Sequence, residues 1–271
     1  MTALKFSRKN LGIPYALFLA VFVILPLLLI VYYAFTVDGK FTFANFTDFF
    51  TTTTNLTVLL QSFCIAFLTT VLCLLIGYPV AYLLARSPLK QKSVFLMLFV
   101  LPMWINFVLR TAAMKELLYV LGFYESGELG YVNTIIGMVY DYLPVTILPL
   151  YTVLLKLDKN VLEASADLGA RPATTFFRAT LPMSAPGIVS AITMVFLPTT
   201  TSYVISDTLG NSKVTIIGKL IESKFNSGAT NAWNTGSAIA LILLVLIFAT
   251  MLISGKFGDE NADQARGSGL W

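Results

Sequence analysis

Histidine is absent from the 271-residue sequence, and cysteine occurs only twice. Without histidine, neither metal catalysis nor histidine-based acid–base chemistry is favoured, and two cysteines do not restore them. Cys64 and Cys73 are nine residues apart in one apolar segment. At about 100° per residue, they lie on opposite faces of a helix and cannot form a disulfide with each other.

Two further motifs of enzymes are missing. The sequence contains no G-x-x-x-x-G-K-[ST] motif, so the chain does not itself bind nucleotide phosphates. Its carboxylates are scattered through the loops and do not suggest a glycosidase-type pair. An intramembrane enzyme is therefore disfavoured, and no catalytic residue, metal ligand or cofactor site is predicted.

Charged residues are scarce, at 12% of the chain, whereas 57% are hydrophobic and the mean hydropathy is +0.80. Soluble domains carry about a quarter charged residues, so these values predict an all-α integral membrane protein in contact with lipid. The net charge of +4 is spread over the loops. It indicates orientation in the membrane and not a nucleic-acid partner.

Six apolar segments are each close to the ~20 residues that cross a bilayer as a helix. They cover about residues 13–35, 56–85, 93–109, 132–155, 181–205 and 235–253. The first exceeds the ~7–15 apolar residues of a signal peptide and lacks a cleavage site, so we expect it to remain. Residues 1–257 are thus predicted to form one transmembrane domain, and residues 258–271 a disordered tail.

The distribution of positive charge predicts the orientation. Twelve of the 18 Lys and Arg residues lie in the N-terminal segment, the loops at residues 86–92 and 156–178, and the C-terminal segment from Lys256 onward. By the positive-inside rule these segments, including both termini, are cytoplasmic. The segments at residues 37–55, 110–131 and 206–234 are then external in this multi-pass membrane protein.

Residues 157–182 form a polar segment between two spans and contain signals for a short helix. Asn160 followed by Glu163 is typical of a capping box, which predicts that the helix begins there. Gly169 can adopt the left-handed conformation that ends a helix, and Pro172 cannot continue it. A helix of about two turns is expected.

One face of this helix is small and apolar and is suited to docking on another surface. The face consists of Val161, Ala164, Ser165 and Leu168. Glu163 and Asp167 are four residues apart, so their charges repel, and a basic partner would relieve that cost. The alternative is an amphipathic helix resting on lipid headgroups, with Arg171 and Arg178 near the acids.

Ionisable and aromatic residues in the spans are candidates for a solute pathway, because a charge at the centre of a span costs about 2.5–3.5 kcal/mol. Asp141 lies between Tyr140 and Tyr142 and either contacts a cationic solute or pairs with Arg110. Nine of the eleven prolines lie in or at the ends of spans and either kink helices or help form a pathway.

Asp207 follows Tyr203 at the end of the fifth predicted span and is either a pathway residue or a solvated helix cap. Trp104 either lines the pathway or belongs to the aromatic belt at the membrane surface. Glu222 is a weaker candidate, because Ile216, Ile217, Leu220 and Ile221 predict an amphipathic external helix around it.

The polar segment resembles the signature loop of bacterial ABC importer permeases, which is Glu-Ala-Ala, three residues, Gly, nine residues, Ile, one residue, then Leu-Pro. The matching residues are Glu163, Ala164, Ser165, Gly169, Leu181 and Pro182. Ser165 replaces the second Ala, and Ala179 stands where the family has a β-branched residue. The full spacing between two spans is far more specific than the first half alone.

This resemblance implies a type I ABC importer permease fold with six transmembrane helices and a cytoplasmic coupling helix. The coupling residues would be Glu163, Ala164, Ser165, Asp167 and Gly169. The implied partners are an ABC ATPase homodimer that binds ATP and Mg, a second homologous permease and an extracytoplasmic solute-binding protein. This chain would hold no cofactor itself and would lie in a bacterial inner membrane.

Over nearly all six spans the chain is similar to the spermidine/putrescine importer permeases. The resemblance rests on residues 101–106 with Arg110, on residues 142–144 and 148–151, on residues 156–159, and on residues 197–198 and 203–207. It implies that polyamines are the substrate. The alternatives are an importer permease for another small solute and a secondary transporter or channel, which would not need the signature helix.

Overall fold

The computed structural model describes residues 12–88, 90–124 and 129–267, and in these ranges it is almost entirely helical. The prediction of an all-α protein is thereby confirmed. The chain divides into two compact units, Met1–Leu56 with Leu220–Leu246 and Thr57–Lys219 with Ile247–Trp271. Each unit is described by itself.

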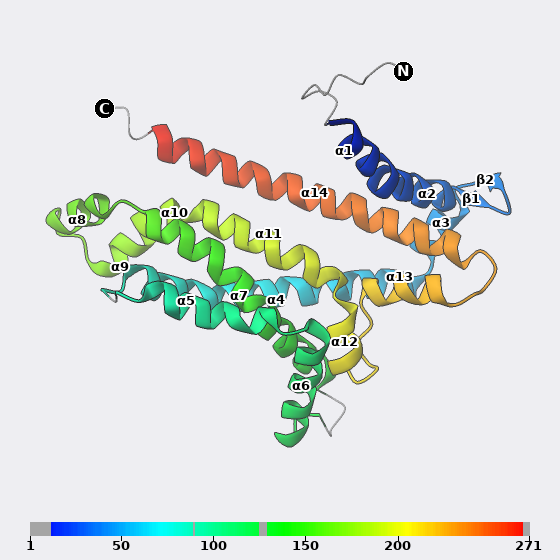
Figure 1. Cartoon of the computed structure of the whole chain (residues 1–271), viewed down its shortest axis with the longest axis horizontal. Helices are drawn as coiled ribbons and strands as arrows, with labels where there is room; N and C mark the ends of the chain where they lie inside the picture. Colours follow the sequence, from blue (N-terminus) through cyan, green and yellow to red (C-terminus); the bar gives the residue numbers. More distant parts are fainter. Residues whose placement is uncertain (1–11, 89, 125–128, 268–271) are drawn as a thin grey trace, which may run out of the picture. The chain divides into compact units, whose positions relative to one another are not determined.

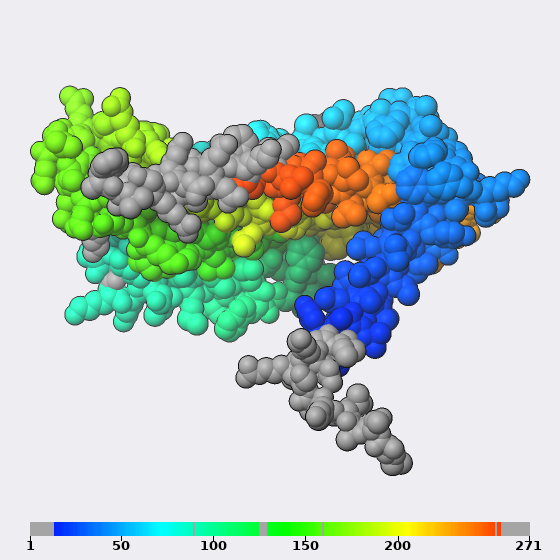
Figure 2. Space-filling model, turned by 90° about the horizontal axis from the view of Figure 1, so that it is seen from above, coloured from blue at the N-terminus to red at the C-terminus, as the bar shows by residue number. Residues whose placement is uncertain are grey.

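The first unit begins with a long apolar helix of three segments and continues into a small hairpin (Figure 1). Its elements are α1 (Gly12–Leu19), η1 (Ala20–Ile24), α2 (Leu25–Ala34), β1 (Thr36–Val37), β2 (Lys40–Phe41) and α3 (Ala44–Thr51). The antiparallel strands pair Thr36 with Phe41. Most apolar side chains of α1 and α2 are exposed (Figure 2, blue). Such a surface is suited to hydrocarbon.

Two asparagine side chains fix the backbone after α2. Asn45 Nδ2 donates to the carbonyl of Ala34 at 3.0 Å. Asn234, near the start of α14 (Ala232–Gly267), donates to the carbonyls of Tyr33 and Thr36 at 3.2 and 2.5 Å. Because the last carbonyls of a helix have no partner within it, these amides satisfy groups that the hairpin leaves open.

The second unit contains most of the helices. They are α4 (Thr53–Arg86), α5 (Lys92–Val100), η2 (Leu101–Trp104), α6 (Phe107–Val120), α7 (Gly130–Lys156), α8 (Lys159–Asp167), α9 (Pro172–Thr175), η3 (Phe176–Thr180), α10 (Leu181–Met183), α11 (Ala185–Thr201) and α12 (Tyr203–Leu209). The helix α13 (Ile217–Asn226) begins in this unit and ends in the first.

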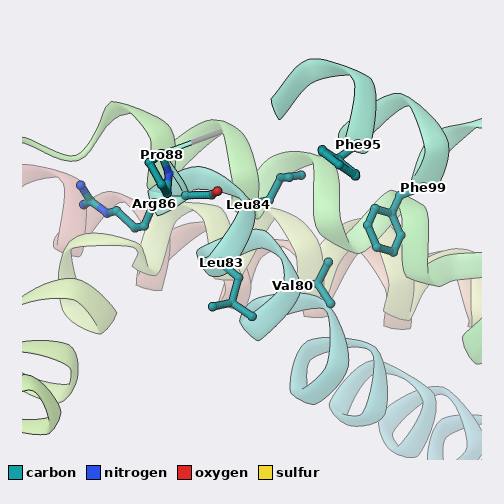
Figure 3. A pocket seen from close by; sticks show the side chains of 8 residues that line it. Val80, Leu83, Leu84, Arg86, Pro88, Phe95 and Phe99 are labelled. Atoms are coloured by element: carbon teal, nitrogen blue, oxygen red, sulfur yellow. The ribbon is translucent and has the colours of Figure 1, made fainter. Parts of the chain in front are cut away.

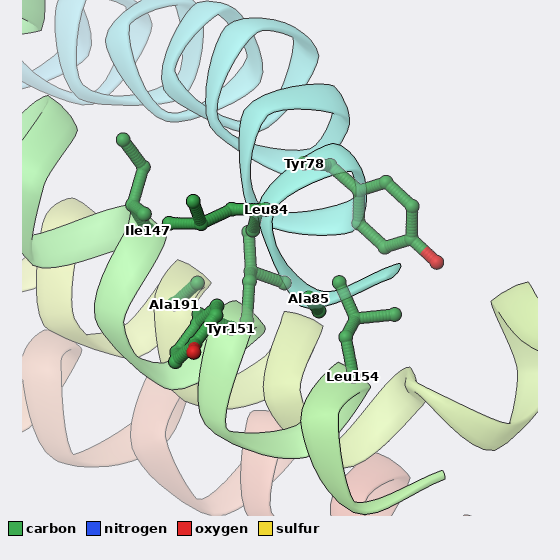
Figure 4. Close-up of a cluster of buried hydrophobic side chains, with 9 residues drawn as sticks. Tyr78, Leu84, Ala85, Ile147, Tyr151, Leu154 and Ala191 are labelled. Carbon is green, nitrogen blue, oxygen red and sulfur yellow. The ribbon is translucent and has the colours of Figure 1, made fainter. Parts of the chain in front are cut away.

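A buried apolar cluster joins α4, α7 and α11 (Figure 4). Its members are Tyr78, Ala81, Leu84, Ala85, Ile147, Leu150, Tyr151, Leu154 and Ala191. Small residues allow the helices to approach closely. A Cβ on Gly187 would lie 3.0 Å from the side chain of Val153, and a Cβ on Gly77 would lie 3.0 Å from that of Thr146. This packing through small residues is typical of membrane helices.

Within the described residues, four helices are long and apolar enough to cross a membrane, and two bent pairs bring the number to six if each pair forms one span. The four are Pro14–Ala34, Thr53–Arg86, Gly130–Lys156 and Ala232–Leu252. The bent pairs are Lys92–Trp104 with Phe107–Val120, at 95°, and Pro172–Met183 with Ala185–Thr201, at 63°.

The bends correct two expected spans. The segment predicted as one span at 93–109 is interrupted, because Asn106 is extended and its side chain accepts from the N–H groups of Val108 and Leu109 to begin a new helix. Helix α6 then extends to Val120, into residues expected to form a loop. The segment predicted at 181–205 is likewise bent, by 63° at Ser184 between α10 and α11, and its helix ends again at Ser202.

The C-terminal segment also differs from the expectation. A disordered tail was predicted from residue 258, but α14 continues as a helix through Gly267. Residues such as Glu260, Ala262, Gln264 and Ala265 favour helix, which explains how the helix continues beyond its apolar part. Residues 268–271 of the expected tail lie outside the described residues.

Candidate functional site

The helix α8 lies between two apolar helices, as the polar segment predicted, but its cap is a different residue. Asp158 Oδ1 accepts from the backbone N–H of Asn160 at 2.9 Å, and the helix begins at Lys159. The expected N-cap, Asn160, is therefore inside the first turn. Asp and Asn are equally good caps, and the carboxylate of Asp158 also interacts favourably with the positive end of the helix dipole.

The end of α8 agrees with the prediction. Gly169 has φ +76°, in the left-handed region. Its N–H donates to the carbonyl of Ala166 at 2.8 Å, and the N–H of Ala170 donates to that of Ser165 at 3.1 Å. This pair of hydrogen bonds is a Schellman motif, which requires a left-handed residue at the position of Gly169. The helix is thus closed at both ends by its own sequence.

The small apolar face of α8 borders a groove. A hollow of about 470 Å³ is lined by Val161, Ala164, Ser165, Leu168, Ala170, Thr174, Arg178 and Ala179. Leu168 is 88% exposed beside it. The hydroxyls of Ser165 and Thr175 lie 2.8 Å apart and join α8 to α9. The face therefore packs on its own chain at Ser165 and remains open at Leu168.

The acidic side chains of α8 remain open to a partner. Glu163 and Asp167 are both exposed, and neither forms an ion pair with a described side chain. Arg171 and Arg178 are also exposed and do not pair with these acids. The unrelieved repulsion between Glu163 and Asp167 is small, a few tenths of a kcal/mol, and a basic surface would remove it.

Asp141 is buried in α7 and forms an ion pair with Nε of Arg110 from α6. Thr111 Oγ1 donates to Asp141 Oδ2 at 3.4 Å, and Arg110 Nη1 donates to the carbonyl of Pro102 at 3.0 Å. The ion pair, which was the alternative to a contact with solute, is therefore present. It also connects α7 to the bend between η2 and α6.

The aromatic neighbours of Asp141 have different surroundings. The guanidinium of Arg110 lies 5.6 Å from the ring centroid of Tyr140, so this ring contacts the cation of the pair. Tyr142 packs against a second buried cluster, which includes Met138 and Ile205. Trp104 is 76% exposed in η2. The structure thus brings Tyr140 and Asp141 together around Arg110 and leaves Trp104 at the surface.

Asp207 and Tyr203 lie on α12, which packs against α6 and α7. Lys219 Nζ is 3.4 Å from Asp207 Oδ1 and 5.9 Å from the ring centroid of Tyr203. The side chain of Asp207 is 57% exposed, and that of Lys219 is 33% exposed. Asp207 is therefore neither at the end of a long span nor a simple cap. A carboxylate and a ring together contact an ammonium group here.

Lys219 was not identified from the sequence, and its position depends on tertiary contacts. The N–H of Ile217 donates to Ser62 Oγ of α4 at 2.7 Å. A Cβ on Gly218 would lie 2.3 Å from the carbonyl of Thr201, so the two backbones touch. These contacts place Lys219 beside the break at Ser202. Lys219 and Asp207 lie on different helices, so no helix or strand periodicity in the sequence predicts that they form a pair.

Apolar helices long enough to span a membrane, a short capped polar helix between them, and ion pairs between helices are the architecture expected of a membrane permease. The comparisons with known proteins agree. Residues 77–258 match the family described as binding-protein-dependent transport system inner membrane component. The chain belongs to this family, which comprises transport subunits and not enzymes.

Two relatives match almost end to end. The spermidine/putrescine transport system permease protein PotB of Haemophilus influenzae is 36% identical over 263 residues, covering 90% of this chain and 91% of that protein. The protein of the same name from Escherichia coli is 34% identical over 257 residues, covering 87% and 92%. The resemblance seen in the signature loop is confirmed by these matches.

Solved structures agree on the fold. A bacterial ABC transporter that imports alginate gives a TM-score of 0.72 at 15% identity, covering 93% of this chain and 94% of that one. The methionine transporter MetNI in an inward-facing form gives 0.55 at 16% identity, covering 76% and 95%. The fold is therefore that of ABC importer permeases, as the signature loop implied.

Proposed function

We propose that this chain is the permease subunit of an ATP-driven importer that moves polyamines, spermidine or putrescine, into the cell. The observation that carries the substrate assignment is the similarity over 90% of the chain to a spermidine/putrescine permease. The cluster of Asp207, Tyr203 and Lys219 supports it, because a carboxylate and an aromatic ring that hold one ammonium have the chemistry to hold another.

In this proposal the partners supply what the chain lacks. An ATPase homodimer binds ATP and Mg, a second, homologous permease completes the pathway, and an extracytoplasmic protein delivers the solute. Each of the two bent pairs forms one span, so that six spans place both termini in the cytoplasm. Helix α8 then faces the ATPases.

The coupling role of α8 follows from its construction. A helix with a fixed cap at each end moves as a rigid body, and its exposed acids offer charge to a basic surface. Closure of the ATPase dimer would displace α8 and switch the pathway between outward and inward access. The residues that take part are Glu163, Ala164, Ser165, Asp167 and Gly169.

The solute pathway is proposed to pass Asp207, Tyr203 and Trp104. Asp141 would act on it through its ion pair with Arg110, and Tyr140 and Tyr142, which flank Asp141 in the sequence, complete the set. Asp207 is the strongest member of this set, because it is exposed and already contacts a cation. A weak, exposed contact holds an ammonium group without trapping it, which a transport pathway requires.

The test is reconstitution of the chain with the subunits that co-purify with it, in liposomes loaded with ATP, followed by uptake of labelled spermidine. ATP-dependent uptake is expected, with Glu163→Lys reducing both uptake and recovery of the ATPase. A complex that contains an ATPase but moves an anion or a neutral sugar would remove the polyamine assignment. Uptake that continues without any ATPase would remove the importer assignment.

A further inference from the structure

A groove lies at the end of α4 that the proposed orientation places in the cytoplasm. The proposed transport function does not use this groove. It lies between α4 and α5 and has a volume of about 550 Å³. The residues that matter to the argument are Val80, Leu83, Leu84, Arg86, Phe95 and Phe99. In Figure 3, Arg86 and Pro88 lie at one end, and Phe99 and Val80 lie toward the other.

The groove has a direction relative to the membrane. Arg86 is the last residue of a helix that can span the bilayer, and Val80 lies six residues earlier. At 1.5 Å per residue, this is a depth of about 9 Å from the end of the helix. Leu83 is 68% exposed and Phe95 is 42% exposed along this path. The groove therefore runs from the end of the span toward its apolar middle and presents an open apolar wall.

The outer end of the groove is positively charged. Nε and Nη2 of Arg86 are buried and have no hydrogen-bond partner in the described part of the chain. Lys90 is exposed nearby in sequence, and residues 86–92 contain no Asp or Glu. Helix α5 also begins here without a side-chain cap from Gln91. Guanidinium nitrogens that lack acceptors and a helix N-terminus without a side-chain cap both favour an anion.

We propose that this groove binds an anionic phospholipid, with the phosphate at Arg86 and one acyl chain along Leu83, Phe95 and Phe99. A phospholipid carries an anion and an apolar chain at the spacing that the groove offers, and the groove opens where lipid headgroups lie. An apolar helix of another protein would fill the inner part but would leave the guanidinium without an acceptor. The site is independent of which solute the chain carries.

The experiment is native mass spectrometry of the full chain, purified in detergent with its co-purifying subunits and titrated with phosphatidylglycerol or phosphatidylcholine. The wild type is expected to retain phosphatidylglycerol at about tenfold lower lipid concentration, the effect of one charge-assisted contact. Arg86→Gln should abolish this preference, and Arg86→Lys should keep part of it. Leu83→Trp should fill the groove and reduce retention of both lipids.

The matched control is Lys156→Gln, which removes a basic residue at the exposed end of another span and should change nothing. An unchanged preference in Arg86→Gln would overturn the proposal, as would full retention of phosphatidylglycerol by Leu83→Trp. Displacement of the lipid by glycerol phosphate at equal concentration would also overturn it, because the site would then bind a free anion. If Arg86→Gln does not fold, Leu83→Trp decides the question alone.

Discussion

Lys219 Nζ lies 3.4 Å from Oδ1 of Asp207, and the same ammonium faces the ring of Tyr203. The pair is partly exposed, so it contributes at most about 1 kcal/mol to stability. The structure thus contains a carboxylate that binds an ammonium weakly and is open to solvent. We therefore expect Asp207 to contribute to binding of the solute and little to the stability of the fold.

Asp207→Asn is predicted to reduce spermidine uptake by about tenfold or more, because it removes the charge that attracts an ammonium. The free energy of unfolding should fall by less than about 1 kcal/mol. Uptake in liposomes and thermal unfolding of the purified chain measure the two effects. Asp48→Asn removes another exposed carboxylate, on α3, and should leave uptake unchanged. Wild-type uptake by Asp207→Asn would contradict the prediction.

The buried pair of Arg110 and Asp141 should behave in the opposite way. Asp141→Asn leaves the guanidinium of Arg110 buried and uncompensated, which costs about 3–5 kcal/mol. We therefore expect a large loss of thermal stability and of yield. Combining Arg110→Met with Asp141→Leu removes both charges and should restore much of the stability, which a double-mutant cycle measures. A stable Asp141→Asn protein that no longer transports would instead indicate contact with solute.

The topology can be tested by thiol labelling. Cys64 is exposed and Cys73 is buried, and both lie in α4. This confirms the prediction that they lie on opposite faces of one helix. Both should resist membrane-impermeant reagents, since the bilayer covers the exposed one. In a chain without these cysteines, Lys90→Cys should label only from the cytoplasm and Lys213→Cys only from outside. Labelling of both positions from outside would remove the proposed orientation.

The local signals of the sequence predicted α8 well. Gly169 ends the helix because only a left-handed residue completes its hydrogen bonds, and this requirement can be read from the order of residues alone. The predicted start is two residues late, because Asp158 and Asn160 are equally good caps by residue type. Locally, only the charge of Asp158 at the positive end of the helix dipole favours it, by about 0.3–1 kcal/mol.

The bends and the charge cluster could not be predicted in the same way. The mean hydropathy of a segment does not depend on whether its helix is straight or bent. The 95° bend within the predicted third span therefore has no effect on the hydropathy that predicted it. Asn106 carried the signal, since a good N-cap inside an apolar run suggests a second helix. The approach of Lys219 to Asp207 depends on contacts of Gly218 and Ile217 with other helices, which no short pattern contains.

The hydroxyl pair of Ser165 and Thr175 should hold α8 against α9. Ser165→Ala removes one hydrogen bond, worth about 0.5–1.5 kcal/mol, and keeps the small volume of the residue. Amide hydrogen exchange in α8 should become up to about tenfold faster. Thr175→Ala should have the same effect, and the double variant no further one. Ser190→Ala, which breaks a hydrogen bond within α11, is the control and should not change exchange in α8.

Gly169 and Gly122 form a matched pair that separates strain from coupling. Gly169 has φ +76° and Gly122 has φ +77°, and a Cβ would meet nothing within 4 Å at either position. Gly122 closes α6 with the same pattern, since Phe123 donates to Leu118 and Gly122 donates to Tyr119. A Cβ at either position therefore meets no neighbour, and valine costs backbone strain of about 1–2 kcal/mol.

Gly169→Val is predicted to lower uptake several-fold while membrane insertion is preserved, because the strain changes how α8 ends and where its exposed acids lie. Gly122→Val should cost similar stability and leave uptake near that of the wild type. Uptake in liposomes, normalised to the inserted protein, and thermal unfolding together measure both effects. Equal losses of uptake in the two variants would mean that strain alone is responsible. Normal uptake by Gly169→Val would remove the coupling role of α8.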